Sequence, residues 1–483
     1  MTSRRTDPVT ETRDADHRDA DDLDVDYLVV GAGAMGMAFT DVLLTETDAT
    51  VALVDRHPRP GGHWNVAYPF VRLHQPSSFY GVNSTPLGHD ALDTAGGNRG
   101  LYELASGPEV VTYFEQVLQR RFLPSGRVRY FPMCEHLGER RWRSLVSGAG
   151  YQAAPHATVV DATYMRVTVP AMGPPAYDVA SGVRCVPVNG LAGLDAPAER
   201  YVVVGAGKTG IDACLFLLAN GVAPDAITWI MPRDAWLLDR ATVQPGTAFF
   251  GATMGNVAGS FEAAAVAATV EDLFDELEAR GVLLRFDPAV RPTMYRCGTV
   301  TRAELDELRR ITDVVRLGRV RRIDPGHITL EHGDVPSTAT TVHVDCSADG
   351  LAWRPPVPVF ADDRITLQTV RSCQQVFSAA FIAHIEAAYD DDEAKNDLCR
   401  VVPHPSTPLD WLRSTLGNTA NAGRWRRDAA LRDWLVTSRL DGFSRTRAEV
   451  EDNPEHLGLL ARIAAAAGPA MANLERLLAD TDG

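Results

Sequence analysis

Lysine is nearly absent from this chain. Of the 47 basic residues only Lys208 and Lys395 are lysines, and the other 45 are arginines. The 63 acidic residues outnumber the basic ones and give a formal net charge of −16. A surface of this sign repels the phosphates of nucleic acids and of anionic lipids. We therefore expect neither nucleic acid nor a membrane to be a partner.

Local cysteine motifs and long apolar segments are also lacking. The seven cysteines contain no CxxC or CxxxxC pair, which excludes a zinc ribbon, offers no local redox disulfide and is typical of a reducing cytoplasm. The histidines show no metal-ligand spacing, so we expect no metal. No uninterrupted apolar run approaches the roughly 18 residues of a membrane-spanning helix, and no secretory signal is visible. The sequence thus predicts a cytoplasmic protein.

The length of the chain indicates more than one domain. Its 483 residues exceed the size at which a single hydrophobic core stops growing, so two or three domains are expected. Residues 1–24 differ from the rest, because they are acidic and almost without apolar side chains. We expect this segment to be a disordered tail.

A strand–turn–helix–strand pattern follows the tail. Residues 27–30 form an apolar run, residues 37–44 favour a helix, and the apolar run at 50–54 ends at Asp55. The glycines of the turn GAGAMG are Gly31, Gly33 and Gly36. In a dinucleotide-binding turn the first glycine makes the bend, the second lets a pyrophosphate approach, and the third lets helix and strand pack closely. Asp55 could accept hydrogen bonds from two ribose hydroxyls.

The same pattern returns 174 residues later, which makes it the main internal repeat of the chain. Residues 201–204 and 226–231 favour strands, and residues 211–219 favour a helix. The turn GAGKTG between them consists of Gly205, Ala206, Gly207, Lys208, Thr209 and Gly210. Two copies with a strand before and a helix after are far more specific than one GxGxxG.

The ends of the two second strands differ in charge. Asp55 closes the first copy, whereas no acid stands at the matching position of the second copy and Arg233 follows. A carboxylate there would repel a 2′-phosphate, and an arginine would pair with it. The first turn therefore suits FAD and the second suits NADPH, with Lys208 adding a charge near the phosphates.

Further elements are expected along the chain. We predict helices at 108–121, 261–280 and 301–311, strands at 128–131, 157–160 and 341–344, a hairpin of 314–323 with 327–331, and a mainly helical region from 375 with a proline-rich break at 403–408.

Three more motifs occur in the order of a known family. They are Gly61-Gly62-His63-Trp64, the stretch from Arg72 to Phe79, and Val344 to Gly350 with Asp349. Together with the two turns they make residues 26 to about 355 resemble the flavin-containing monooxygenases. In that family the GGxW follows the acid of the FAD site, the second stretch passes the flavin ring, and the third returns the chain to the FAD domain. The resemblance therefore implies that Gly62, Trp64 and Asp349 belong to the cofactor site.

The resemblance implies a fold and a reaction. The fold is α/β, with two interleaved Rossmann-like dinucleotide-binding domains and a mainly helical C-terminal region. The FAD domain would comprise 25–195 and 343–483, and the NADPH domain 196–342. The reaction is that of an oxidoreductase in which NADPH reduces FAD and a C4a-hydroperoxyflavin transfers one oxygen atom of O2 to a nitrogen, sulfur or carbon of a small molecule. His74, with Gln75 beside it, falls where the family places a polar side chain next to the flavin.

Two other functions stay open. Residues 182–191 lack the FxGxxxHxxx motif that the family often carries before its second turn. An NADPH-dependent flavin reductase without oxygen insertion could share the two cofactor sites, and so could a nucleotide-bound redox sensor without turnover. The substrate and the oligomeric state do not follow from the sequence.

Overall fold

The computed structural model describes residues 21–348, 350–351, 353–450 and 453–482. Most of the expected disordered tail, residues 1–20, lies outside this part of the chain. Its end differs from the expectation, because Asp21–Leu23 form strand β1, which pairs in parallel with β7 (Gly150–Ala153). Leu23 is buried in that small sheet. The expectation of disorder up to residue 24 is therefore wrong at its last residues.

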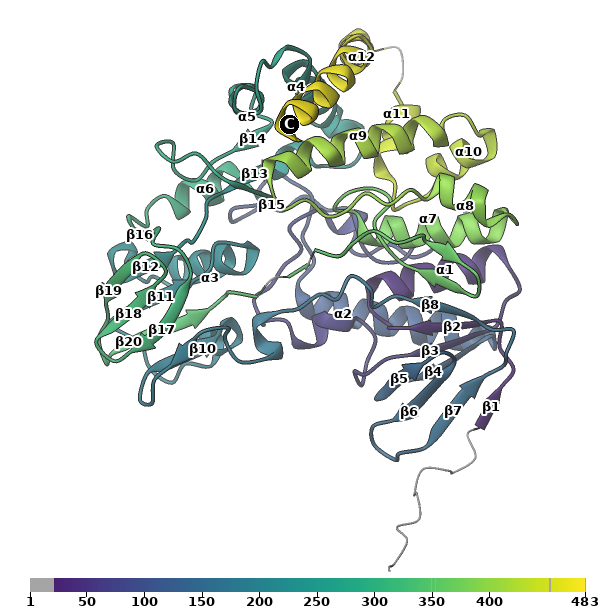
Figure 1. Cartoon of the computed structure of the whole chain (residues 1–483), viewed down its shortest axis with the longest axis horizontal. Helices are drawn as coiled ribbons and strands as arrows, with labels where there is room; N and C mark the ends of the chain where they lie inside the picture. Colours follow the sequence, from purple (N-terminus) through teal and green to yellow (C-terminus); the bar gives the residue numbers. More distant parts are fainter. Residues whose placement is uncertain (1–20, 349, 352, 451–452, 483) are drawn as a thin grey trace, which may run out of the picture.

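A six-stranded sheet forms the centre of the first unit, at the lower right of Figure 1. Its order is β21 (Phe360–Ala361), β22 (Arg364–Thr366), β8 (Thr158–Asp161), β2 (Tyr27–Val30), β3 (Val51–Val54) and β4 (Val128–Phe131). All neighbours pair in parallel except β21 with β22. The continuous apolar runs of β2 and β3 suit such strands, because a parallel sheet is covered on both faces.

Different layers cover the two faces of this sheet. Val29 and Leu53 face a cluster shared with α1 (Ala34–Glu46), α2 (Gly107–Val117) and α7 (Gln375–Ala388). Leu28 and Val30 point the other way, toward the small sheet of β1, β7, β6 (Arg141–Ser144) and β5 (Cys134–Gly138). This alternation follows from the two-residue period of a strand.

The second unit repeats the plan, at the left of Figure 1. Its sheet is parallel, with the order β10 (Arg184–Pro187), β20 (Thr341–Asp345), β11 (Arg200–Val204), β12 (Ile227–Ile230) and β16 (Asp313–Val315). Helices α3 (Lys208–Ala219) and α6 (Arg302–Leu308) cover one face. The other face packs on β9 (Asp178–Val179), β17 (Val320–Asp324), β18 (His327–Leu330) and β19 (Gly333–Pro336).

The chain passes between the two units more than once. After β20 in the second sheet it returns to β21 and β22 at the edge of the first. This confirms the α/β class with two interleaved Rossmann-like units. The division at residues 196 and 342 stays a prediction, although β10 and the end of β20, assigned to the FAD domain, lie in the second sheet.

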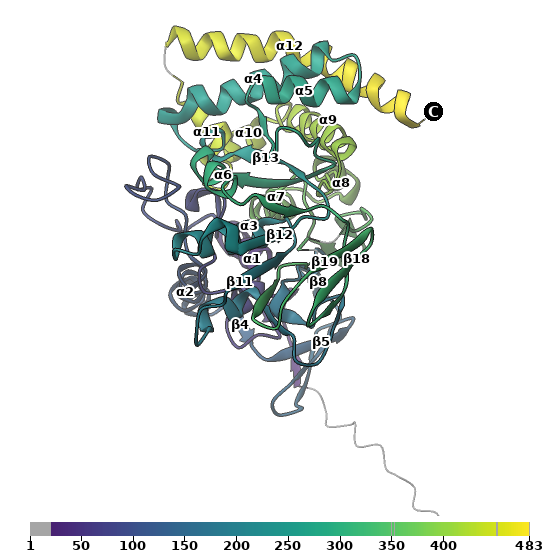
Figure 2. The same ribbon diagram turned by 90° about the vertical axis from the view of Figure 1, so that its left-hand side faces the viewer.

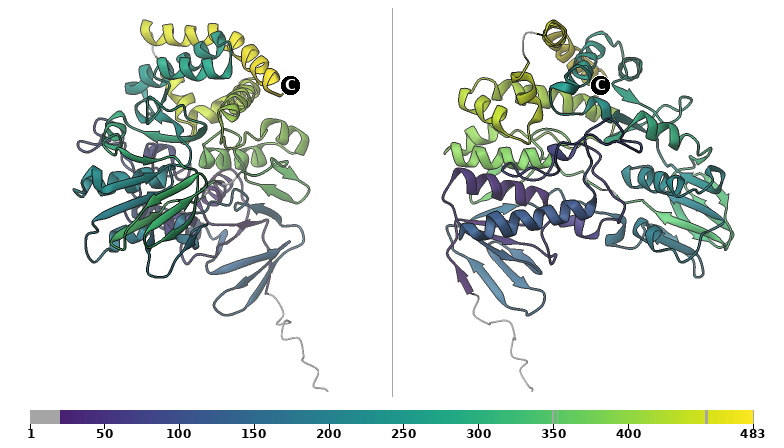
Figure 3. Two further views of the ribbon diagram at one scale, coloured as in Figure 1. Left: turned by 60° about the vertical axis from the view of Figure 1, so that its left-hand side comes forward. Right: turned by 180° about the vertical axis from the view of Figure 1, so that it is seen from behind.

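A third layer lies above both sheets in Figures 2 and 3. It combines β13 (Ala235–Asp239), β14 (Leu283–Leu284) and β15 (Met294–Val300) with α4 (Phe250–Val266), α5 (Val270–Ala279), α9 (Pro408–Trp425) and α12 (Pro454–Asp482). The C-terminal region also contains α8 (Asp392–Leu398), α10 (Ala429–Thr437) and α11 (Gly442–Ala448). The predicted single helix over 261–280 is wrong, because Thr269 caps a new helix by accepting a hydrogen bond from the amide of Asp272.

Helix α12 is the last described element. By length and composition its residues 454–481 could cross a membrane, although polar residues interrupt its apolar sequence. This is weak evidence, because core helices of folded proteins pass the same test. Leu474 and Leu477 are buried in the third layer, and the Asn473 side chain donates to the carbonyl oxygens of Ala264 and Ala267 at the end of α4 (2.8 Å each).

Candidate cofactor sites and active site

The first glycine-rich turn connects β2 to α1. Gly31 has φ +103°, a conformation that side chains strongly disfavour. Gly36 lies in the first turn of α1, and a Cβ built on it would be 1.9 Å from the carbonyl oxygen of Gly31. Both positions therefore require glycine, the first for the bend and the other for the contact between helix and strand.

The second turn, between β11 and α3, has the same geometry. Gly205 has φ +119°, and a Cβ on Gly210 would lie 2.0 Å from the Gly205 carbonyl oxygen. The indole of Trp229 also donates to this oxygen (2.8 Å). The two copies of the sequence repeat thus form turns of the same geometry.

The helices after the two turns begin without a capping side chain. Gly33 precedes α1 and Gly207 precedes α3, and neither position offers a side-chain acceptor. By contrast, Ser106 caps α2 and Thr407 caps α9. The first amide groups of α1 and α3 therefore remain available to an anion, as in a pyrophosphate site. The first turn therefore fits the predicted FAD, and the second fits the predicted NADPH.

Asp55 follows β3 and is buried. Its Oδ2 accepts a 2.6 Å hydrogen bond from the amide of Ala32 in the first turn. Its Oδ1 accepts from the amide of His57 (2.7 Å) and lies 2.9 Å from the imidazole Nδ1 of His57. That hydrogen bond raises the pKa of His57. Asp55 therefore stands where the sequence predicts, but His57 already occupies one of its two oxygens.

The GGxW motif packs directly on the first turn. The amide of Gly61 donates to the carbonyl oxygen of Ala32 (2.8 Å). Gly62 has φ +56°, and a Cβ on it would be 3.0 Å from Cα of Gly33. The indole of Trp64 donates to the hydroxyl of Tyr80 (2.7 Å). The structure thus brings Gly62 and Trp64 to the FAD turn; Asp349 lies outside the described residues.

Lys208 begins α3 and forms an ion pair with Asp212 one turn later. Asp212 also accepts a 2.6 Å hydrogen bond from the hydroxyl of Tyr68, which follows the GGxW motif in the chain and packs in the apolar cluster of the second unit. Thr209 is half-buried beside Lys208 in the first turn of α3. Lys208, the predicted phosphate-binding lysine, is therefore held by the carboxylate of Asp212 on its own helix.

Arg233 is exposed two residues after Met231, at the end of β12. The next residue, Asp234, is buried and pairs with Arg316 through hydrogen bonds of 2.8 and 3.1 Å. This ion pair raises the pKa of the Arg316 guanidinium. The acid near the second site is thus neutralised within the chain, and Arg233 is the cation closest in sequence to the end of β12.

His74 lies in the segment between the two units. Its Nδ1 is buried and has no hydrogen-bond partner in the described structure. Burial, together with the charges of Lys208 and Arg240, lowers the pKa of His74 to about 3, so the imidazole is neutral at neutral pH. A neutral imidazole with an unused ring nitrogen can donate or accept one hydrogen bond.

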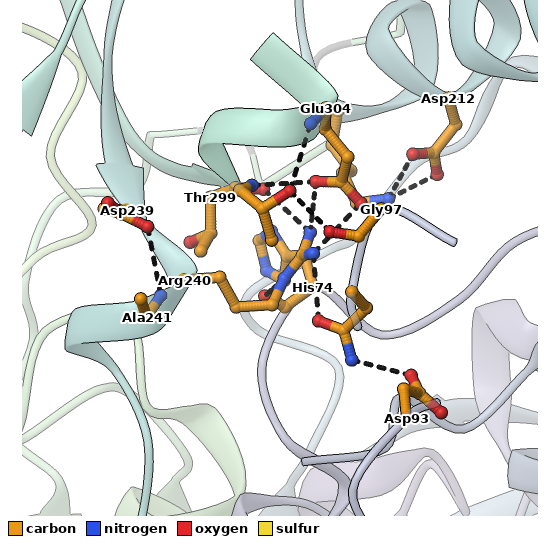
Figure 4. Close-up of polar contacts among 12 residues, drawn as sticks. His74, Asp93, Gly97, Asp212, Asp239, Arg240, Ala241, Thr299 and Glu304 are labelled. Atoms are coloured by element: carbon orange, nitrogen blue, oxygen red, sulfur yellow. Dashed lines mark hydrogen bonds and ion pairs between the residues drawn. The ribbon is translucent and has the colours of Figure 1, made fainter. Parts of the chain in front are cut away.

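Arg240 holds the backbone of His74 in place (Figure 4). Its Nε donates to the His74 carbonyl oxygen (3.1 Å), and its two terminal nitrogens donate to Glu304 (3.0 and 2.9 Å). Only 2% of Arg240 is exposed, so the pair with Glu304 is largely desolvated. Thr301, the cap of α6, donates to the carbonyl oxygen of Gly97 (2.7 Å). No local pattern in the sequence indicates this cluster, because Arg240 is one of 45 arginines.

A pocket of about 160 Å³ lies between the first unit and the third layer. Of the predicted catalytic pair, both within the described chain, Gln75 is among its lining residues and His74 is not. Gln75 and Phe79 come from the stretch that resembles the flavin-facing one, and the rest of the lining includes Leu238, Tyr295, Cys297, Cys373, Trp411, Ser414, Thr415 and Asn418. The four α9 residues, Trp411, Ser414, Thr415 and Asn418, lie on one face of that helix. Their spacing of three and four residues is visible in the sequence.

A second pocket, of about 200 Å³, borders the GGxW motif. Arg59, Trp64 and Tyr68 line it together with the N-terminal turn of α2. It lies on the first unit, so the two pockets flank the segment that carries Trp64, His74 and Gln75.

Comparison with known proteins gives close relatives. The chain is 56% identical over 415 residues to the uncharacterized proteins Rv2000 of Mycobacterium tuberculosis and Mb2023 of Mycobacterium bovis. The match spans 86% of this chain and 77% of each relative. The chain belongs to the same family as these mycobacterial proteins. Residues 29–68 also match the NAD(P)-binding Rossmann-like domain family, which identifies the first turn as a dinucleotide-binding one.

Solved structures of similar shape are flavin monooxygenases. They include a steroid monooxygenase bound to NADP (16% identity, TM-score 0.48, 76% of this chain and 85% of that chain) and an open form of cyclohexanone monooxygenase (14%, 0.48, 94% and 99%). A flavin-containing monooxygenase from Stenotrophomonas maltophilia has 16% identity and a TM-score of 0.43, covering 76% of this chain and 97% of that chain. At these identities and TM-scores the likeness concerns the fold and gives no information on the activity of this chain.

Proposed function

We propose that this protein is an FAD- and NADPH-dependent monooxygenase that oxygenates a small molecule at a nitrogen, sulfur or carbon atom. The carrying observation is the glycine turn built twice, with Asp55 beside the first copy and Arg233 after the second. One chain then offers two dinucleotide sites of different charge, which is what a flavoprotein needs to accept electrons from a 2′-phosphorylated nucleotide.

Residues of the first unit would hold FAD. The amide groups at the start of α1 would bind its pyrophosphate, and the free lone pair of Asp55 Oδ2 would accept a ribose hydroxyl. The amides at the start of α3, with Lys208 and Arg233, would bind NADPH. Bound FAD supplies the chemistry of electron transfer from NADPH and of oxygen activation.

The segment between the units would serve the reaction with oxygen. His74 is neutral and has an unused Nδ1, so it can share one hydrogen bond with a group bound beside it. Arg240 fixes the backbone of His74, and the Glu304 pair fixes Arg240, so the imidazole is positioned by a buried network. Gln75 faces the adjoining pocket, where a small substrate would bind.

The test measures three quantities on the purified full-length protein. Absorbance gives the FAD content, which we expect to be about one per chain. Steady-state kinetics compare NADPH with NADH as the reductant. Oxygen uptake and H2O2 release are then measured with panels of amines, thioethers and ketones.

A monooxygenase couples NADPH oxidation to product formation with little H2O2. Sustained NADPH oxidation that yields stoichiometric H2O2 with every compound would favour the flavin reductase. Reduction without turnover in air would favour the redox sensor. A protein that does not take up FAD would contradict all three.

A further inference from the structure

Cys297 and Cys373 form a disulfide that no local spacing of cysteines predicts. Cys297 lies in β15, Cys373 lies 76 residues later in the loop before α7, and their Cα atoms are 6.6 Å apart. The absence of a CxxC motif excluded a local pair, but the fold joins two distant cysteines. Both line the 160 Å³ pocket that Gln75 also lines. This disulfide thus lies at the edge of the apolar cluster of the third layer, where it forms part of the pocket wall.

The backbone of both cysteines is strained. Cys297 has φ +54° and Cys373 has φ +61°, in the left-handed region that residues with a side chain seldom adopt. Such strained conformations often occur at functional sites.

A titratable side chain completes the cluster. The Cys297 and Cys373 sulfurs and one ring nitrogen of His404 lie within 4.8 Å of one another. The Nδ1 of His404 is buried and has no hydrogen-bond partner in the described part of the chain. Burial, with the charge of Arg296, lowers the pKa of His404 to about 4, so the ring is neutral at neutral pH and can take part in a hydrogen bond.

The same three residues could be taken for a metal site. A zinc ion would need two separate thiolates, whereas the two sulfurs here are bonded to each other. The structure therefore favours redox chemistry over metal binding at this cluster.

We propose that Cys297–Cys373 is a thiol–disulfide exchange site whose partner is a low-molecular-weight thiol that enters the pocket. Cys373 is half-buried and Cys297 is 6% exposed, so we take the sulfur of Cys373 as the point of attack. The small pocket volume excludes the surface of a protein reductant and admits a small molecule. This site goes beyond the proposed oxygenation and does not depend on bound FAD.

The exchange balances in two steps. An incoming thiol loses its proton to water, and the thiolate sulfur attacks Sγ of Cys373. The bond between the two cysteine sulfurs breaks, and the Cys297 thiolate takes a proton from water, with the neutral His404 ring beside it as a hydrogen-bonding group. A second thiol attacks the outer sulfur of the mixed disulfide, which releases the small disulfide and leaves Cys373 as a thiol. The protein disulfide gains two electrons and two protons, and two thiols are oxidised to one disulfide.

The other cysteines provide an internal control. Cys134, Cys214, Cys346 and Cys399 are buried, and burial raises the pKa of each of these thiols. They are therefore poor nucleophiles in the folded protein. Cys185 is the more exposed free thiol, so Cys185→Ser removes the background reaction without touching the pocket.

The experiment titrates the folded full-length protein with mixtures of cysteamine and cystamine, followed by alkylation and peptide mass analysis. We expect Cys297 and Cys373 to become alkylated together over one narrow range of thiol-to-disulfide ratio. In Cys297→Ser the remaining Cys373 should form a mixed disulfide with cystamine at least tenfold faster than Cys297 does in Cys373→Ser. His404→Leu, which removes the hydrogen-bonding ring beside the sulfurs, should slow opening of the wild-type pair on the order of tenfold.

Wild-type titration keeps the proposal testable if a cysteine variant does not fold. A pair that stays closed in excess dithiothreitol until the protein unfolds would overturn the proposal and mark a structural disulfide. Two free thiols with one equivalent of zinc in the isolated protein would overturn it in favour of a metal site. Faster reaction at Cys297 than at Cys373 would contradict the assigned point of attack.

Discussion

The hydroxyl of Tyr68 donates a 2.6 Å hydrogen bond to Asp212, the carboxylate that pairs with Lys208. Tyr68 follows the GGxW motif and packs in the apolar cluster of the second unit, and Asp212 and Lys208 belong to the helix after the second nucleotide turn. Burial and the carboxylate raise the pKa of Tyr68, so the phenol stays protonated and remains a donor. One hydrogen bond thus connects the segment after the GGxW motif to the predicted NADPH site.

Removing this hydroxyl should loosen that connection. Tyr68→Phe leaves the buried ring in place and deletes a hydrogen bond to a charged group, which contributes about 1.5–3 kcal/mol. We expect urea unfolding to show a loss of this size and the KM for NADPH to change, because Lys208 is left with a less constrained partner. Tyr151→Phe is the control, since the Tyr151 ring, in the small sheet of the first unit, packs on Phe131 and Trp142. Equal effects of the two variants would contradict the role of Tyr68.

The third glycine of each turn provides a prediction that separates the two cofactors. A methyl group on Gly36 or Gly210 would lie 1.9 or 2.0 Å from a carbonyl oxygen of the preceding turn, so the backbone must move. We expect Gly36→Ala to lose FAD, and Gly210→Ala to retain FAD but raise the KM for NADPH at least tenfold. Absorbance and steady-state kinetics measure the two effects.

Gly255→Ala in α4 is the matched control for these variants. A Cβ at Gly255 meets nothing within 4 Å, and alanine is favoured over glycine in a helix by about 1 kcal/mol. This variant should keep both cofactors and unfold at a slightly higher temperature. Loss of FAD from Gly210→Ala with retention by Gly36→Ala would reverse the assignment of the two sites.

The nucleotide turns could be predicted from sequence because every signal for them is local. Their strands, glycines and helices lie in two continuous segments, residues 27–54 and 200–230, and β2 and β4 have the predicted bounds. The break between α4 and α5 was missed although Thr269 and Asp272 form a capping pattern, because the apolar spacing continues across it. Here a local cap prevailed over helical periodicity.

The contacts between distant segments could not be predicted in this way. Arg240 meets Glu304 and the His74 carbonyl oxygen only after three segments have packed together. Cys297 and Cys373 are joined across 76 residues by the placement of β15 beside the loop before α7. Such pairs have no spacing rule, so one sequence without a fold does not reveal them.

The Asp55–His57 pair predicts a pH dependence. Its hydrogen bond raises the pKa of His57 above the ordinary 6.5. A group with a raised pKa in the folded state stabilises that state fully below its unfolded pKa, and this contribution is lost as the pH rises through the folded value. We therefore expect this contribution to be present below about pH 6 and lost above the raised pKa. NMR titration of the His57 ring measures this pKa, and Asp55→Asn should return it toward 6.5. An unshifted His57 in the wild type would contradict the pair.

Arg233 should decide between NADPH and NADH. It is exposed at the end of β12, and the neighbouring Asp234 is already paired with Arg316. An arginine–phosphate contact contributes about 1.5–3 kcal/mol, or roughly ten- to hundredfold in affinity. Arg233→Ala should therefore raise the KM for NADPH by that factor and leave the KM for NADH nearly unchanged.

Arg200→Ala is the control for loss of a surface charge, because Arg200 lies at the start of β11 and pairs with Asp313. Equal losses with both cofactors would remove Arg233 from the 2′-phosphate site.

The last prediction concerns the coupling of NADPH oxidation to oxygenation. His74 is neutral, its Nδ1 is unused, and its backbone is fixed by Arg240, so its imidazole can supply one positioned hydrogen bond. Removing such a bond costs about 1–2 kcal/mol, which is roughly a five- to thirtyfold change in a rate. We expect His74→Ala to bind FAD and NADPH normally but to release a larger share of the oxidised NADPH equivalents as H2O2. The share is measured as H2O2 formed per NADPH consumed at saturating substrate. His332→Ala, in the exposed hairpin of β18 and β19, should leave this ratio unchanged. An unchanged ratio in His74→Ala would mean that His74 only supports the loop. The polar group beside the flavin would then be Gln75, which lines the pocket.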